Sequence, residues 1–180
     1  MNFKKYISCF IMYVSISMIL VSLFLGNYNL VEAKNAVSAE GAISSLVFGM
    51  PPTTSTVNMN TVQKFVLSGD WRLITENGKV TNFTSNFYTG PVNGANNHTH
   101  QLSNLRVPSD SLIQVSPDRS TRIIGILNVG TNGKNAWNDV HTVITISNER
   151  TITIKLADND TQNHFMNQPI YGIVKHIKTD

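Results

Sequence analysis

The sequence predicts an all-β protein, a single antiparallel β-sandwich or barrel of about eight to nine strands, preceded by a signal segment and a linker. Three observations carry this prediction. From Val62 onward the chain consists of short runs rich in Val, Ile, Thr and Phe, turn residues separate these runs roughly every ten positions, and no segment shows a helical apolar period. Nearly all links between the runs are short, which favours antiparallel neighbours over crossover connections.

Taken in order, each predicted strand is an apolar or alternating run that ends at a turn signal. The clearest pair is 139–147 and 150–157, where apolar and polar residues alternate as in a sheet with one buried face and one wet face. The predicted strands are 62–67, 70–76, 79–88, 98–106, 111–116, 121–129, 139–147, 150–157 and 170–177.

Four turn sequences define the hairpins between these strands. Asn77-Gly78 and Asn132-Gly133 tolerate the positive φ angles of a tight hairpin turn, although the segment from Asn132 to Asn138 is also long enough for a wider loop. Pro117-Asp118 supplies the fixed φ of a first turn position, and Asn148-Glu149 links the two alternating strands.

The N-terminal segment predicts export. Lys4 and Lys5 precede the apolar run Tyr6–Leu25 and the small-residue exit Val31-Glu32-Ala33, which is the order of a secretory signal peptide over residues 1–33. An uncleaved anchor is the alternative, because the run approaches the length of a membrane span. In either case we expect the rest of the chain outside the cell, secreted or at the cell surface, with membrane contact only through an uncleaved N-terminal segment.

The remainder divides into a linker and one domain. Residues 34–61 contain Pro51-Pro52 and a polar Thr/Ser run, so they are interpreted as a linker with at most one strand, over Ala42–Met50, and residues 62–180 as the β domain. The single cysteine, Cys9, lies in the signal segment, so stability must come from packing without a disulfide. Three sequons, at Asn82, Asn97 and Asn159, predict a glycoprotein where the host glycosylates.

Charge and missing motifs exclude several function classes. The formal charge of +3 falls to +2 without the signal segment, and 14% charged residues is well below the roughly 25% of ordinary domains. We therefore expect no nucleic-acid partner. The sequence has no Gly-x-Ser-x-Gly elbow, phosphate-binding glycine loop or cysteine nucleophile, so serine-elbow hydrolysis, nucleotide use and thiol chemistry have no support.

The candidate chemistry lies in the histidines. His98 and His100 stand two apart at the start of a predicted strand, so both rings should project from one face and can converge on one metal ion. His164, in the loop Asp158–Pro169, is the predicted third ligand, and His141 is the alternative. His176 is expected in the core or at its rim.

Three nitrogen ligands without a thiolate suit Zn(II) or Cu(II), and an open fourth position could activate water. One of the acids Asp139, Glu149, Asp158 and Asp160 could orient a ligand ring. No catalytic residue is assigned, so enzyme and non-enzyme alternatives stay open. The alternative function is a metal-free extracellular structural or recognition module, in which the histidines are surface residues and the partner is a small molecule or a cell-envelope component.

Two further features have structural interpretations. Trp71 and Trp137 are expected to anchor the core or its edge, with stacking on sugars as the alternative. Asp158-Asn159-Asp160 is expected to be a solvated turn, with calcium binding as the alternative.

Four short segments carry a resemblance. Ser68–Leu73, Gly94–His100, Trp137–Val140 and His164–Gly172 together resemble uncharacterised secreted archaeal β-domain proteins over about residues 62–175. Such proteins have no established activity, so the resemblance implies a β domain outside the cell. The three histidines of the candidate site stand inside these segments.

Overall fold

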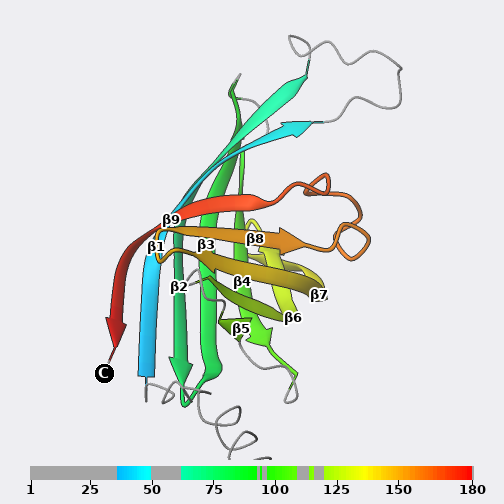
Figure 1. Ribbon diagram of the computed structural model, residues 1–180. Coiled ribbons are helices and arrows are strands. Elements are labelled where there is room, and N and C mark those ends of the chain that lie inside the picture. Colours follow the sequence, from blue (N-terminus) through cyan, green and yellow to red (C-terminus); the bar gives the residue numbers. More distant parts are fainter. Residues whose placement is uncertain are drawn as a thin grey trace, which may run out of the picture. The chain divides into compact units, whose positions relative to one another are not determined.

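The computed structural model forms an all-β domain (Figure 1). It describes residues 36–49, 62–92, 94, 97–108, 114–115 and 120–179. The predicted signal segment, the end of the predicted linker and the Pro117-Asp118 turn lie outside these residues. The described part contains no helix long and apolar enough to cross a membrane.

Nine strands make up the described part of the chain. They are β1 (Ala36–Gly49), β2 (Gln63–Glu76), β3 (Lys79–Pro91), β4 (His98–Arg106), β5 (Gln114–Val115), β6 (Thr121–Thr131), β7 (Lys134–Ser147), β8 (Thr151–Leu156) and β9 (Ile170–Thr179).

Eight of these strands close into an antiparallel barrel. The sheet runs in the order β4-β3-β2-β1-β9-β8-β7-β6, and pairing between β4 and β6 completes the ring. The short strand β5 pairs with the start of β6 beside it. The all-β prediction is confirmed, and the pairings of β1 with β9 and of β4 with β6 decide for a barrel rather than a sandwich.

The predicted hairpin turns are tight. Asn77-Gly78 has φ angles of 50° and 72°, and Asn132-Gly133 has 51° and 72°, as a two-residue turn with positive φ at both positions requires. The wider loop to Asn138 is therefore wrong, because β7 already begins at Lys134. Asn148-Glu149, with φ of 52° and 56°, connects β7 to β8 in the same way.

Besides β7, which begins before its predicted start at 139, two strands differ from the sequence prediction. Strand β1 is fourteen residues long and begins six residues before the single short strand expected in the linker. Strand β2 runs unbroken through Ser68-Gly69, where a break between two strands was expected. A side chain at Gly69 would place its Cβ 2.0 Å from the carbonyl oxygen of Asn86, so this glycine permits close approach of β3 instead of ending the strand.

Inward-facing apolar side chains fill the middle of the barrel around Trp71. The Trp71 indole N–H donates to the carbonyl oxygen of Ile173 at 3.1 Å, and its ring lies opposite Gly41, where a Cβ would come within 2.8 Å of the indole nitrogen. The largest fully buried apolar side chains are Trp71, Phe83, Leu102, Ile123, Leu127, Val129, Val140, Ile144, Ile152, Ile154 and Ile170. This packing leaves one end of the barrel for polar side chains.

Candidate metal centre

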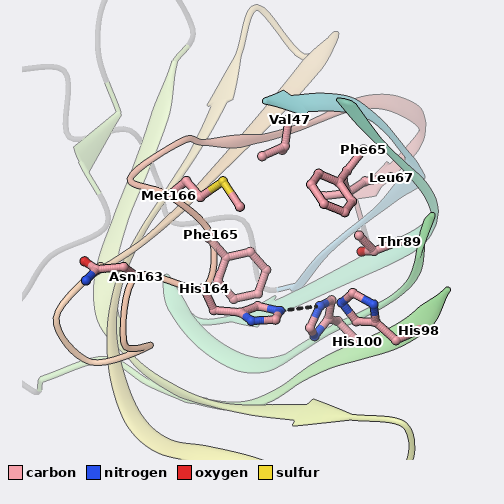
Figure 2. A pocket seen from close by; sticks show the side chains of 10 residues that line it. All are labelled: Val47, Phe65, Leu67, Thr89, His98, His100, Asn163, His164, Phe165 and Met166. Carbon is pink, nitrogen blue, oxygen red and sulfur yellow. Dashed lines mark hydrogen bonds between the residues drawn. The ribbon is translucent and has the colours of Figure 1, made fainter. Parts of the chain in front are cut away.

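The candidate site lies at one end of the barrel, which we call the site end. Here β1 and β3 end, β2, β4, β7 and β9 begin, and the loop 157–169 connects β8 to β9. His98 and His100 come from the first residues of β4, and His164 comes from the loop (Figure 2).

The three imidazoles form a close cluster. One ligand nitrogen from each lies within 4.8 Å of the other two, and the Nε2 atoms of His100 and His164 are 3.2 Å apart. The ring centroid of His98 lies 4.7 Å from that of His100 and 5.6 Å from that of His164. The three histidines therefore lie close enough to hold a metal ion, as the sequence predicted for their placement.

Tetrahedral coordination at about 2.0–2.1 Å places two nitrogens roughly 3.3 Å apart, which the pair His100 and His164 already matches. The widest pair, up to 4.8 Å apart, must close by up to about 1.5 Å to reach the same geometry.

Strand pairing fixes the orientation of His100. Its pairing partners are Phe87 on β3 and Thr131 on β6, and the Thr131 hydroxyl lies 3.1 Å from the His100 Nδ1. The Phe87 ring lies 5.3 Å from the imidazole centroid. With Nδ1 held by Thr131, the Nε2 atom of His100 faces His164. Ligating histidines are commonly oriented in this way, by a hydrogen bond from the ring nitrogen that does not bind the metal.

The loop that carries His164 is held by a hydrogen bond between its own two ends and by a second tie, to β1. The Asp158 carboxylate accepts a hydrogen bond from the backbone N–H of Asn167 at 2.9 Å. The Gln168 side chain donates to the Phe48 carbonyl at 2.7 Å and accepts from its N–H at 3.0 Å. These bonds hold the loop across the site end without a regular element.

A third tie involves a histidine outside the cluster. The Asp160 carboxylate accepts from the backbone N–H of His141 at 2.9 Å and lies 2.7 Å from its Nδ1. These hydrogen bonds, the backbone one first, lower the pKa of Asp160. His141, the alternative third ligand, thus points to solvent and secures the loop, while His164 joins the cluster.

Aromatic side chains surround His164. The Trp137 ring lies 5.0 Å from the His164 centroid at an interplanar angle of 43°, and Phe165 lies 5.1 Å away. Phe165 is buried and also contacts His100 at 5.1 Å. His164 is exposed, but the side of its ring that faces His100 is packed.

Desolvation in the cluster favours the neutral form of both His100 and His164. Desolvation first, and then the neighbouring His164 and His98, lower the pKa of His100 to about 3, against a smaller raising effect from a hydrogen bond to the Gly130 backbone. Burial and then His98 also lower the pKa of His164. Neutral imidazoles offer the lone pairs that a metal ion requires.

A pocket of about 200 Å³ opens beside the cluster (Figure 2). Its walls are apolar on one side and carry the three histidines on the other. The lining residues are Val47, Phe65, Leu67, Thr89, His98, His100, Asn163, His164, Phe165 and Met166.

The other predictions for polar residues have mixed outcomes. His176 is exposed on β9, so its predicted place in the core or rim is wrong; the alternating pattern that suggested burial loses its inner face beyond Val174. The four candidate acids have other places in the structure. Asp158 accepts a hydrogen bond within the loop, Asp160 accepts one from β7, and Asp139 pairs with Arg106. Glu149 lies in the turn between β7 and β8. Asp158-Asn159-Asp160 is a turn, as expected. Trp71 is a core anchor and Trp137 an edge anchor, as expected.

Sequence reasoning missed Thr131 and Thr89, which face the histidines. Both lie at inward positions that the period of two along β6 and β3 would identify, but the pairing partners of those strands were needed to place them beside β4.

Comparisons of the chain with protein-family models, curated proteins and solved structures find no match. The resemblance to secreted archaeal β-domain proteins therefore stays a prediction, and function has to be inferred from the site itself.

Proposed function

We propose that this protein binds one Zn(II) or Cu(II) ion through His98, His100 and His164. The observation that carries the proposal is the convergence of three imidazole nitrogens, within 4.8 Å of one another, from two separate elements of the barrel. Surface histidines have no reason to converge in this way, and Thr131 holds one of the rings in a ligand orientation.

The donor set favours a borderline metal. The described cluster contains three imidazoles and neither thiolate nor carboxylate, which suits Zn(II) or Cu(II) better than the oxygen-preferring Mg²⁺ or Ca²⁺. Three neutral ligands leave the charge of the ion uncompensated. They also leave a fourth position, at which bound water would become acidic, so metal-assisted water activation is the chemistry that the site could support.

We further propose that the protein acts outside the cell, secreted or anchored at its surface. The proposal comes from the N-terminal sequence, with its two lysines before an apolar run and a small-residue exit. An extracellular site also fits the donor set, because histidines, unlike thiolates, are not consumed by an oxidising environment.

Metal analysis of the protein, purified without a metal-affinity tag, tests the metal proposal. After equilibration with Zn(II) or Cu(II) and removal of free ion, we expect one ion per chain, lost in a His98→Ala/His100→Ala double variant. His176→Ala, which removes an exposed histidine from β9, is the matched control and should keep the ion.

Two results would contradict the proposal. One is the absence of both metals from the equilibrated protein, and the other is equal metal content in the double variant. Either result would favour the metal-free structural or recognition module.

A further inference from the structure

The pocket beside the histidines has a size that limits its ligand. Its volume of about 200 Å³ is somewhat larger than the roughly 150 Å³ of an apolar cavity that holds benzene. A molecule of about six to ten non-hydrogen atoms fits this space. Peptides, oligosaccharides and nucleotides exceed it.

The two sides of the pocket differ in polarity, so a ligand that fits it has an apolar part and a polar part. Val47, Phe65 and Leu67, from β1 and β2, face Phe165 and Met166 from the loop, so this side of the pocket is apolar (Figure 2). The three histidines lie at the other side. A ligand that matches both has a compact apolar body and one polar head.

A buried hydroxyl identifies where the head would lie. Thr89 is 8% exposed, and its Oγ1 has no hydrogen-bond partner among the described residues. Buried hydroxyls are normally bonded, because an unsatisfied one costs about 1–3 kcal/mol. Thr89 lines the pocket and is the direct pairing partner of His98, so its hydroxyl stands next to the proposed metal.

Charge selects the kind of head. An ion held by three neutral imidazoles keeps its full positive charge, and no carboxylate is among the described pocket residues. An anionic oxygen group would neutralise this charge, and a second oxygen of the same group could accept the hydrogen bond that Thr89 has to donate.

We infer that the pocket binds a small apolar carboxylic acid, with its carboxylate between the open position of the metal and the Thr89 hydroxyl and its apolar body against Phe65, Leu67 and Phe165. This inference rests on the proposed metal site. The carboxylate replaces the bound water, so in this state the site recognises a ligand rather than activating water.

Titration calorimetry with benzoate, a ring of the right size with a carboxylate head, tests the inference. We expect the zinc-loaded protein to bind one benzoate, and the metal-free protein to bind it at least about tenfold more weakly, because the charged contact is lost. Acetate, which lacks the apolar body, and benzyl alcohol, which lacks the anionic head, should each bind at least about tenfold more weakly than benzoate.

Thr89→Val removes the hydroxyl and keeps the shape of the side chain. It should weaken benzoate binding about ten- to a hundredfold, the usual value of one hydrogen bond to a charged group. Thr99→Val, at an exposed position of β4, is the matched control and should leave benzoate affinity unchanged. Zinc content is measured for each variant.

The outcomes separate this inference from the metal proposal. Stoichiometric zinc with benzoate binding no tighter than acetate would overturn the inference and leave the metal site standing. Unchanged benzoate affinity in Thr89→Val would overturn the role of the hydroxyl. Failure to bind any metal would overturn both proposals.

Discussion

The interior of the barrel contains a packed region around Trp71 and a site region around His100. The two regions differ in whether their buried hydroxyl groups have hydrogen-bond partners. In the packed region the Ser85 hydroxyl donates to the Asp70 carbonyl at 2.9 Å, and Thr142 donates to the Lys155 carbonyl at 3.1 Å. In the site region Thr89 is also buried, but its hydroxyl has no partner among the described residues.

This difference shows that the same scaffold serves two purposes. The packed region satisfies both of these hydroxyls and so contributes stability, while the site region keeps an unsatisfied hydroxyl and two adjacent imidazoles, of His100 and His164, whose protonation is disfavoured. Stability gained in the first region offsets what the second region costs. Four predictions test this division, in order of decreasing effect.

Truncating the centre of the packed region should have the largest effect. Trp71→Ala removes a side chain that is 1% exposed together with its hydrogen bond to Ile173. We expect the free energy of unfolding to fall by about 3–5 kcal/mol, measured by urea denaturation. Trp137→Ala, at the partly buried edge near His164, is the comparison and should cost less. Equal losses would contradict the distinction between the regions.

Acid should destabilise the metal-free protein through the site region. The folded-state pKa of His100, about 3, lies below its unfolded value of about 6.5, so the unfolded chain binds more protons between these values. The stabilising contribution is complete above pH 6.5 and is lost as the pH falls toward 3. The expected slope is up to about 1.4 kcal/mol per pH unit.

Urea denaturation at pH 6, 5 and 4 measures this slope. His100→Asn removes the titrating ring. The free energy of unfolding of this variant should therefore change less steeply with pH, by the amount that corresponds to about one bound proton. A variant slope as steep as that of the unmodified protein would assign the acid sensitivity to other groups.

Loosening the loop tie should have a smaller effect, and it should affect metal binding. Asp160→Ala removes the acceptor for both the backbone and the ring of His141. The loop that positions His164 then has more freedom, so zinc affinity should fall about fivefold, equivalent to about 1 kcal/mol. His141→Ala keeps the backbone bond and should weaken binding less. A reversed order of these two variants would contradict the proposed tie.

Removing the unsatisfied hydroxyl should give the smallest change, of opposite sign. Thr89→Val should raise the free energy of unfolding of the ligand-free protein by up to about 1 kcal/mol, because a buried polar group without a partner is replaced by a methyl group. The corresponding change in the packed region, Thr142→Val, leaves the Lys155 carbonyl without its donor and should not stabilise. Destabilisation by both variants would show that the two hydroxyls are equivalent.

Much of the fold follows from local patterns in the sequence. Positive φ at Asn77-Gly78 and Asn132-Gly133 is a property of two adjacent residues, so the hairpins could be predicted from them. The shared face of His98 and His100 follows from the period of two within one strand. Closure into a barrel could not be predicted in this way, because it depends on pairing between β1 and β9, which are distant in sequence.

The site was predictable to the same extent. The sequence placed two ligands and offered two candidates for the third, and the path of the loop chose between them. His141 is exposed and contacts Asp160, so it secures the loop instead of joining the cluster. The backbone hydrogen bonds within the loop after Asp158 bring His164 next to the histidines of β4. Thr131 and Thr89 escaped prediction, because their roles arise from neighbouring strands rather than from a motif.

The pairing of the first and last strands of the barrel also determines when the protein can fold. β1 and β9 are paired along seven register positions, so the ring cannot close until β9 has been synthesised and is free to pair. Contacts of such high sequence separation form slowly. The barrel therefore stays open until β9 has been made, and the site end, to which the loop before β9 contributes His164, is complete only when the ring closes.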